Sequence, residues 1–249
     1  MRDQSSRVFV VTGGASGIGQ ATAEQLVAGG DSVVLLDRDA DRLRSISRTL
    51  DADRALARPV DVADEVQVAE AIGAGLARFG RLDGVVTSAG LFDSGDLVPL
   101  EDLDLAVFDR VIATNLRGTV LTLRAVLPHL ESGSAIVTVA STAGLRGHGF
   151  GAAYTASKGA IVALTRLLAV QYGPKGVRVN CVCPGATAGE GMGSVFLDAE
   201  AGGPLVRDVP LRRVGQAAEL GATIVALLGD STSYLTGQII AVDGGATSR

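Results

Sequence analysis

The chain has 249 residues, of which 47% are hydrophobic and 20% charged, and its formal net charge at pH 7 is −5. This composition is that of an ordinary globular protein, and the scattered basic residues argue against nucleic-acid binding. No apolar stretch approaches the length of a bilayer-spanning helix, and the N-terminus lacks the pattern of a signal peptide. We therefore expect a cytoplasmic protein without a membrane or nucleic-acid partner.

The predicted elements alternate between short apolar runs and segments of helical length. Strand-like runs occupy, in chain order, Val8–Val11, Val33–Leu36, Gly84–Thr87, Ala135–Val139, Val177–Val182 and Gln238–Val242. The intervening helical segments include Gly17–Ala28, Asp64–Phe79, Leu103–His129, Ala152–Tyr172 and Ala217–Leu228. The segment Arg54–Val60 is a weaker strand candidate because Pro59 cannot donate to a strand ladder.

Strict alternation of apolar strands and helices is typical of a parallel sheet. The pattern predicts an α/β fold in which a single Rossmann-like domain, residues 1–249, has a doubly wound parallel sheet with helices on both faces. The longest stretch without clear periodicity runs from Pro184 to Gly215. A loop of this length in a compact domain is commonly functional, so we expect a substrate lid around residues 185–215.

The segment Thr12–Gly19, directly after the first strand, is rich in glycine and leads into a helix. Its spacing is Gly-x-x-x-Gly-x-Gly rather than the commoner Gly-x-Gly-x-x-Gly. Such a loop lets the backbone approach a pyrophosphate, which the N–H groups of the helix N-terminus then bind. The sequence thus predicts a dinucleotide site, although the glycines alone are equally compatible with a simple turn.

Asp37 ends the second strand, 18 residues after Gly19. An acidic residue at this place binds the adenosine ribose hydroxyls of a dinucleotide, and its charge repels the 2′-phosphate of NADP. We therefore expect NAD(H) as the cofactor, with Arg38 offsetting part of the repulsion. The structural alternative is that Asp37 only caps the next helix.

Tyr154 and Lys158 form a Tyr-x-x-x-Lys motif on a predicted helix, so both side chains share one helix face. An ammonium beside the phenol favours the phenolate and is expected to lower the tyrosine pKa. Tyr154 can then exchange a proton with a substrate oxygen while a hydride moves to or from the cofactor. The pair alone is weak evidence, since this spacing also arises by chance on exposed helices.

Taken together, the motifs resemble the short-chain dehydrogenase/reductase family of the single-domain type, over essentially the whole chain. The resemblance rests on Thr12–Gly19, Asp61-Val62, Ala89-Gly90, Asn115, Ser141, Tyr154-Thr-Ala-Ser-Lys158, Pro184-Gly185 and the tail Thr236–Gly245.

The resemblance implies a catalytic set of Asn115, Ser141, Tyr154 and Lys158. In this set Ser141 holds the substrate oxygen, Lys158 also binds the nicotinamide ribose, and Asn115 anchors a proton-relay water. It implies a cofactor site formed by Gly13, Ser16, Gly17, Ile18, Gly19, Asp37, Asp61, Val62, Ala89, Gly90, Tyr154, Lys158, Pro184, Gly185 and Thr187. It also implies a homotetramer.

The sequence departs from the family pattern at two places. Thr87-Ser88 replaces the usual Asn-Asn before Ala89-Gly90, and we expect both hydroxyls to form local hydrogen bonds instead. A threonine common at the fifth position after the proline is Gly189 here, and Thr187 lies two places earlier. Anchoring of the nicotinamide carboxamide is therefore uncertain from sequence.

Three segments can form the walls of a substrate pocket: Leu91–Asp96, Leu145–Ala153, which contains His148, and the lid with its apolar run Met192–Leu197. These segments do not identify the substrate. The sequence predicts an NAD(H)-dependent oxidoreductase for a secondary alcohol or its ketone. The alternatives are an NADP(H)-dependent 3-oxoacyl-(carrier protein) reductase and a non-catalytic dinucleotide sensor.

The two cysteines, Cys181 and Cys183, form a Cys-x-Cys pair on a predicted strand. A zinc site needs more cysteine or histidine ligands, and the chain has only His129 and His148 besides. We expect no metal, and two buried thiols that face the same side of the strand.

Overall fold

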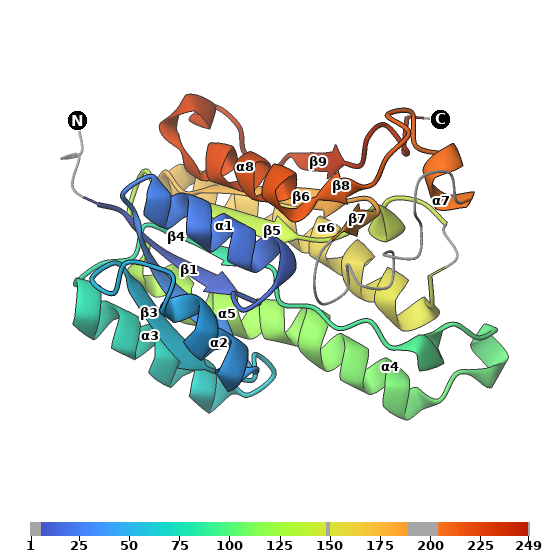
Figure 1. Cartoon of the computed structure of the whole chain (residues 1–249), viewed down its shortest axis with the longest axis horizontal. Coiled ribbons are helices and arrows are strands. Elements are labelled where there is room, and N and C mark those ends of the chain that lie inside the picture. The colour runs from blue at the N-terminus through green and yellow to red at the C-terminus, as the bar shows by residue number, and fades with distance from the viewer. Residues whose placement is uncertain (1–5, 148–149, 189–203, 249) are drawn as a thin grey trace.

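The computed structural model of the protein describes residues 6–147, 150–188 and 204–248 (Figure 1). Within these residues seven parallel strands form one sheet in the order β3-β2-β1-β4-β5-β6-β9. The strands are β1 (Val8–Thr12), β2 (Ser32–Asp37), β3 (Ala55–Pro59), β4 (Gly84–Thr87), β5 (Ala135–Val139), β6 (Arg178–Pro184) and β9 (Ile239–Val242). The strand order reverses between β1 and β4, as the predicted doubly wound fold requires.

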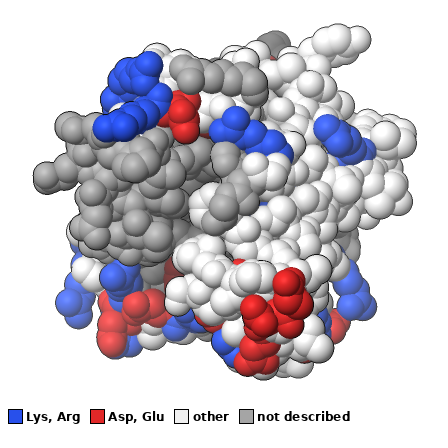
Figure 2. All heavy atoms as spheres, turned by 90° about the vertical axis from the view of Figure 1, so that its right-hand side faces the viewer, with Lys and Arg blue, Asp and Glu red and all other residues white. Residues whose placement is uncertain are grey.

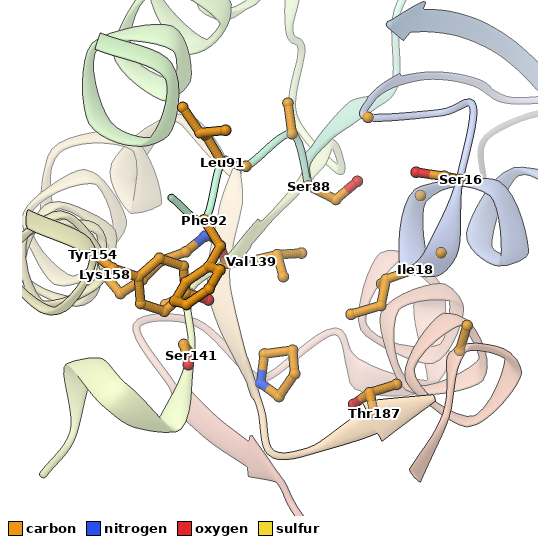
Figure 3. A pocket seen from close by; sticks show the side chains of 18 of the residues that line it. Ser16, Ile18, Ser88, Leu91, Phe92, Val139, Ser141, Tyr154, Lys158 and Thr187 are labelled. Atoms are coloured by element: carbon orange, nitrogen blue, oxygen red, sulfur yellow. The ribbon is translucent and has the colours of Figure 1, made fainter. Parts of the chain in front are cut away.

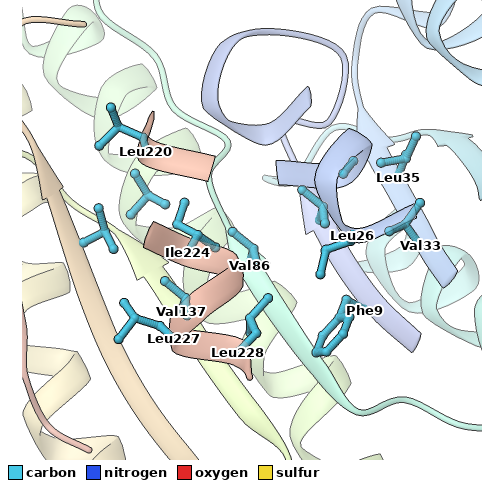
Figure 4. Packing of buried hydrophobic residues seen from close by; sticks show 14 of the residues in the cluster. Phe9, Leu26, Val33, Leu35, Val86, Val137, Leu220, Ile224, Leu227 and Leu228 are labelled. Atoms are coloured by element: carbon cyan, nitrogen blue, oxygen red, sulfur yellow. The ribbon is translucent and has the colours of Figure 1, made fainter. Parts of the chain in front are cut away.

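Helices cover both faces of the sheet because successive side chains of each buried strand point to opposite sides. On β1, Phe9 and Val11 pack into one apolar cluster and Val8 and Val10 into another. The first cluster is covered by α1 (Gly17–Ala28), α2 (Ala40–Ser47) and α8 (Ala217–Leu228), and the second by α3 (Glu65–Phe79), α5 (Gly118–Val126) and α6 (Ala152–Tyr172). Figure 4 shows Leu26 of α1 and Ile224 of α8 against the first face.

The weak strand candidate is confirmed as β3, with Pro59 as its last residue. β3 lies at the edge of the sheet and pairs only with β2. An edge strand tolerates proline because it leaves one side of its backbone unpaired. The next residue, Val60, supplies an N–H donor to the carbonyl oxygen of Asp37 at 2.8 Å.

The predicted helical segment Leu103–His129 is helical from Leu105 to His129, but it is not a single regular α-helix. The structure has α4 (Leu105–Ile112), a π-helical turn at Ala113–Arg117, α5, and a final 3₁₀ turn at Leu127–His129. π-Helical turns inserted between helices are rare and are frequent at functional sites. This turn contains Asn115, which the family resemblance assigns to the catalytic set.

The remaining elements lie beyond the carboxyl ends of the strands. The two-residue strands β7 (Thr187–Ala188) and β8 (Gly215–Gln216) pair with each other, and α7 (Pro204–Arg207) lies between them in sequence. In Figure 1 these elements gather at one end of the sheet with the C-terminus. Among the helices that the structure describes, none combines the length and apolar character needed to cross a membrane.

Candidate active site

A cavity of about 710 Å³ opens at the carboxyl ends of the strands, where the strand order reverses. Open α/β sheets bind their ligands at this location, and the volume is in the usual range for ligand sites. Figure 3 shows Ser16 and Ile18 on one side of the cavity and Tyr154, Lys158 and Ser141 on the other. The glycine loop and the tyrosine-lysine pair therefore line a common cavity.

The glycine loop is shaped by positions that require glycine. Gly13 and Gly17 have positive φ angles of 67° and 51°, which side-chain-bearing residues rarely adopt. A Cβ atom on Gly13 would lie 2.9 Å from the backbone of Ala89. A side chain on Gly13 would therefore collide with the backbone of Ala89, and any residue other than glycine would strain the loop at both positions.

The N-terminus of α1 faces this loop without a side-chain cap. Ser16 is the N-cap residue, and its hydroxyl makes no capping hydrogen bond within the described residues. Gly17, Ile18 and Gly19 form the first turn and line the cavity. Uncapped N–H groups at the positive end of a helix dipole bind phosphates, so this part of the site fits a dinucleotide.

Asp37 is held at the end of β2 by two backbone groups. Its carboxylate accepts hydrogen bonds from the N–H groups of Ala15 and Asp39, both at 3.0 Å. It lines the cavity together with Arg38 and Arg42. The first bond ties Asp37 to the glycine loop and so fixes the position of its carboxylate at the end of β2.

The adenine end of the proposed site lies beyond β3. Asp61 and Val62 both line the cavity. The Asp61 carboxylate accepts a hydrogen bond from the N–H group of Ala63 at 2.9 Å, and Val62 is buried. Val62 also packs against Gly118, where a larger residue would collide with its side chain.

Tyr154 lies in the first turn of α6, and only 5% of the residue is exposed. Its ring centroid lies 5.9 Å from that of Phe92, edge to face, and 5.4 Å from that of Phe150. Burial raises the pKa of the Tyr154 phenol above its ordinary value, whereas a hydrogen bond with Ser141 acts in the opposite direction. The sequence-based expectation of a lowered pKa is therefore not met, because desolvation of the phenolate dominates.

Lys158 lies one helical turn further along α6 and is also buried. Its Nζ atom donates a hydrogen bond to the carbonyl oxygen of Val139 at 3.0 Å and lies 5.7 Å from the centroid of the Tyr154 ring. Burial lowers the pKa of the ammonium from 10.5 to about 8, and the Cys181 and Cys183 thiols act in the opposite direction. The expected arrangement of the two side chains on one face is confirmed.

Ser141 follows β5 and lines the cavity next to Tyr154. Its Oγ atom accepts a hydrogen bond from the N–H group of Ala143 at 3.1 Å. This bond leaves the hydroxyl proton available, since a serine hydroxyl can accept and donate at once.

Asn115 is fully buried in the π-helical turn and does not line the cavity. Its Oδ1 atom accepts a hydrogen bond from the N–H group of Leu91 at 2.6 Å, and its Nδ2 atom donates to the carbonyl oxygen of Leu91 at 3.0 Å. Nδ2 also donates to the Ser157 hydroxyl at 3.1 Å. The side chain thus joins the cavity wall at Leu91 to α6.

The geometry agrees with the comparisons to known proteins. A family model described as enoyl-(acyl carrier protein) reductase matches residues 13–247. The chain is 38% identical to 2-(R)-hydroxypropyl-CoM dehydrogenase of Xanthobacter autotrophicus, over 98% of this chain and 99% of that protein. It is also 38% identical to cis-4-hydroxycyclohexanecarboxylate dehydrogenase of Sinomonas cyclohexanicum, over 98% of both chains. The crystal structure of levodione reductase superposes with a TM-score of 0.89 at 37% identity, covering 97% of this chain and 98% of that one.

The chain belongs to the short-chain dehydrogenase/reductase family. Members of this family are oxidoreductases that use nicotinamide dinucleotides. Of the residues that the resemblance assigns to the site, all except Asn115 line the cavity: Gly13, Ser16, Gly17, Ile18, Gly19, Asp37, Asp61, Val62, Ala89, Gly90, Ser141, Tyr154, Lys158, Pro184, Gly185 and Thr187.

The first departure from the short-chain dehydrogenase/reductase pattern has two different outcomes. Ser88 donates its hydroxyl to the carbonyl oxygen of Thr12, as expected. The Thr87 hydroxyl is buried, and no partner for it is found within the described residues, so the expected local bond of Thr87 is wrong. The Thr12 hydroxyl accepts a hydrogen bond from the N–H group of Ala89 at 3.1 Å. This bond replaces part of the local hydrogen bonding that the family's two asparagine side chains would provide.

The second departure, Gly189, lies outside the described residues, as do His148 and residues 189–203 of the predicted lid, including Met192–Leu197. Thr187 donates its hydroxyl to the carbonyl oxygen of Gly185 at 3.0 Å and lines the cavity. The lining residues that sequence reasoning missed include Arg42, Thr114, Ala217 and Ala246, which come from elements distant in sequence. Asp208 and Val209, which also line the cavity, belong to the predicted lid.

The cysteine pair lies beneath Lys158 on β6. Both thiols are fully buried, and their Sγ atoms are 3.8 Å apart, so they face the same side of the strand as predicted. No cluster of metal-ligating side chains is present in the part of the chain that the structure describes.

Proposed function

We propose that this protein is an NAD(H)-dependent oxidoreductase that interconverts a secondary alcohol and its ketone, with Tyr154 as general acid and base. The observation that carries the proposal is the position of Tyr154, Lys158 and Ser141 in the same cavity as the glycine loop and Asp37. A dinucleotide bound along this cavity supplies a nicotinamide ring that accepts or donates a hydride. The protein's own side chains transfer the proton and hold the substrate oxygen.

In the direction of alcohol oxidation, the Tyr154 phenolate removes the hydroxyl proton as the hydride leaves the substrate carbon. Ser141 donates its hydroxyl proton to the substrate oxygen and holds it beside Tyr154. In ketone reduction, the phenol returns its proton to the same oxygen. Lys158 holds a positive charge near the phenolate and contributes to binding of the nicotinamide ribose.

Asn115 is proposed to complete the catalytic set. Its side chain is engaged by Leu91 and Ser157 and stays outside the cavity. The proposed relay water can therefore contact the backbone of the π-helical turn rather than the amide. The preceding residue, Thr114, lines the cavity, so a water in the cavity can reach the backbone of this turn.

The preference for NAD(H) rests on Asp37. Its carboxylate is fixed by two backbone N–H groups and lines the cavity at the end of β2. A fixed carboxylate accepts hydrogen bonds from ribose hydroxyls and repels a 2′-phosphate. Arg38 and Arg42 also line this end of the cavity and reduce the repulsion in part.

The main alternative is an NADP(H)-dependent 3-oxoacyl-(carrier protein) reductase. An acidic carrier protein requires a basic docking patch near the cavity. In Figure 2, the described charged side chains on the upper part of the face that carries the C-terminal elements are mostly basic, whereas acidic and basic side chains lie together on its lower part. The fixed carboxylate of Asp37 argues against this alternative, because it disfavours NADP(H).

The substrate pocket beside Tyr154 is lined by Leu91, Phe92 and Phe150. These side chains favour an apolar ring or chain over a polyol, because they offer contact area and few hydrogen-bonding groups. The names of two relatives, levodione reductase and cis-4-hydroxycyclohexanecarboxylate dehydrogenase, support a cyclic secondary alcohol or ketone. A lid formed by residues 185–215 is proposed to cover this substrate.

A homotetramer is proposed from the family resemblance and from exposed apolar side chains on the two long helical segments. Val120 on α5 and Leu167 and Val170 on α6 are 40%, 51% and 76% exposed. In the C-terminal region Tyr234 is fully exposed. Leu167 and Val170 are three residues apart on α6 and so share one face, and contiguous exposed apolar patches mark protein–protein interfaces.

The proposed function is tested by titrating the protein with NAD, NADH, NADP and NADPH. A panel of cyclic and acyclic secondary alcohols and ketones is then screened by absorbance of the reduced nicotinamide. Tight NADH binding with turnover of a secondary alcohol or ketone supports the proposal. Preference for NADPH favours the carrier-protein reductase, and binding without any turnover across the panel favours the non-catalytic sensor.

A further inference from the structure

The helix that carries Tyr154 and Lys158 has no capping side chain of its own. The N-cap residue of α6 is Gly151, and α6 runs for 21 residues from Ala152 to Tyr172. In contrast, α2, α3 and α4 are each capped by an aspartate at their own N-cap position. The first N–H groups of any helix need an acceptor, so those of α6 must be satisfied from elsewhere.

Asp96 supplies this acceptor from a distant part of the chain. Its Oδ1 atom accepts a hydrogen bond from the N–H group of Ala153 at 2.9 Å, and its Oδ2 atom accepts from the N–H group of Tyr154 at 2.8 Å. The residue is fully buried, and 58 positions separate it from Tyr154. One of its two bonds is thus made to the backbone of the proposed catalytic residue itself.

The contact leaves no room for a side chain at Gly151. A Cβ atom there would overlap the backbone oxygen and the carboxylate of Asp96. Gly151 therefore allows Asp96 to lie close to the first turn of α6. Gly151 has no side chain to cap the helix, and the Asp96 carboxylate caps it instead. An alanine at position 151 would displace the carboxylate without removing it.

Asp96 is the last residue of the segment Leu91–Asp96, which also contacts the site through Leu91 and Phe92. The segment starts at Leu91, which Asn115 holds through two hydrogen bonds, and continues through Phe92, whose ring packs edge to face on Tyr154. The segment then closes on the first turn of α6 through Asp96. The segment has six residues, and hydrogen bonds fix both of its ends.

We propose that Asp96 is a positioning residue for the reaction: its buried carboxylate fixes the first turn of α6 and thereby sets the place of the Tyr154 hydroxyl relative to Ser141 and the substrate. This inference rests on the proposed function of Tyr154 as acid and base. Asp96 does not line the cavity and contacts neither reacting group, so it acts through Tyr154. Misplacement of a reacting group by about 1 Å can reduce the rate about 100-fold.

The test compares Asp96→Ala, Asp96→Asn and Gly151→Ala with the wild-type protein. We expect kcat to fall about 10- to 100-fold in Asp96→Ala and Gly151→Ala, with the NADH dissociation constant unchanged within twofold. Asp96→Asn keeps one acceptor oxygen and should recover part of the loss. Gly151→Ala retains the carboxylate, so it decides the question even if Asp96→Ala does not fold.

Asp64→Ala is the matched control, because Asp64 accepts bonds from two backbone N–H groups at the start of α3, as Asp96 does for α6. This control should lose stability and keep its kcat. The inference is overturned if Asp96→Ala and Gly151→Ala keep wild-type kcat, or if they lose no more kcat than Asp64→Ala.

A second readout separates this inference from the proposed function. With ¹³C-labelled tyrosine, the NMR signal of the Tyr154 ring should shift in Asp96→Ala and in Gly151→Ala but not in Asp64→Ala. Tyr172 and Tyr234 are the only other tyrosines, so the signal can be assigned with Tyr154→Phe. Absence of turnover in the wild-type protein would defeat the proposed function, whereas an unshifted Tyr154 signal would defeat the positioning role.

Discussion

The Nζ atom of Lys158 lies 5.7 Å from the centre of the Tyr154 ring, and both side chains are buried on the same face of α6. Burial penalises the charged form of each group, so it raises the pKa of the phenol and lowers that of the ammonium to about 8. The charge that favours the phenolate is present at neutral pH and is lost as the pH rises through about 8.

The lowered pKa of Lys158 predicts that the difference in stability between the wild-type protein and a variant without this lysine depends on pH. Between pH 8 and 10.5 the unfolded state binds more protons at Lys158 than the folded state, so the contribution of Lys158 to the free energy of unfolding rises with pH. Between pH 8 and pH 10 the wild-type protein should gain about 2 kcal/mol relative to Lys158→Met. Urea unfolding of both proteins at the two pH values measures this difference, and equal gains would contradict the lowered pKa.

Phe150 contributes to the burial that raises the Tyr154 pKa. Its ring lies 5.4 Å from the Tyr154 ring, and Phe150→Ala would admit water beside the phenol. We expect the pKa of Tyr154 to fall, so the alkaline rise of kcat/KM for alcohol oxidation should move to lower pH. KM for an apolar cyclic alcohol should rise about tenfold because the ring contact is lost.

The control for Phe150 is Phe79→Ala, which removes an aromatic ring at the end of α3, away from the cavity lining. Its pH profile should match that of the wild-type protein. A pH profile of Phe150→Ala identical to that of the wild-type protein would show that the ring does not contribute to desolvation of the phenol.

The cofactor assignment predicts the effect of Asp37→Asn. Asparagine keeps an acceptor oxygen for one backbone N–H group but removes the charge that repels a 2′-phosphate. The ratio of the NADPH to the NADH dissociation constants should fall about tenfold, which corresponds to about 1.4 kcal/mol. Asp61→Asn should leave this ratio unchanged, because Asp61 lies beside the proposed adenine site; an equal change in both variants would contradict the role of Asp37.

The proposed assembly predicts a particle of four chains in light scattering. Replacing Leu167 and Val170 with glutamate places charges on an α6 surface where the wild-type side chains are 51% and 76% exposed. A homotetramer that uses this helix should dissociate in the double variant, while Val66→Glu on α3, another exposed apolar position, should not. A monomeric wild-type protein would refute the assembly.

Much of the fold could be predicted because buried parallel strands are continuous apolar runs and the glycine loop follows the first of them. The π-helical turn could not, since Ala113–Arg117 has an ordinary helical composition and the hydrogen-bond partner of Asn115 in this turn, Leu91, lies 24 positions earlier. The raised Tyr154 pKa was also missed. It depends on the rings of Phe92 and Phe150, which come from different loops.

The role of Asp96 shows a further limit of sequence reasoning. Asp96 belongs to a polar loop segment, where aspartate usually faces solvent or bonds a neighbouring backbone group. Its partners at Ala153 and Tyr154 are 57 and 58 residues away. The one available signal was the glycine at the start of a long predicted helix, a position where a capping side chain is expected.

The central claim, that Tyr154 transfers the proton in an NAD(H)-dependent reaction, is tested most directly by Tyr154→Phe. This variant keeps the ring and its packing on Phe92 and Phe150 and removes only the hydroxyl. With an alcohol that the wild-type protein oxidises, kcat should fall by about two to four orders of magnitude while the NADH dissociation constant stays unchanged. Turnover at the wild-type rate would contradict the claim and assign the proton transfer to another group.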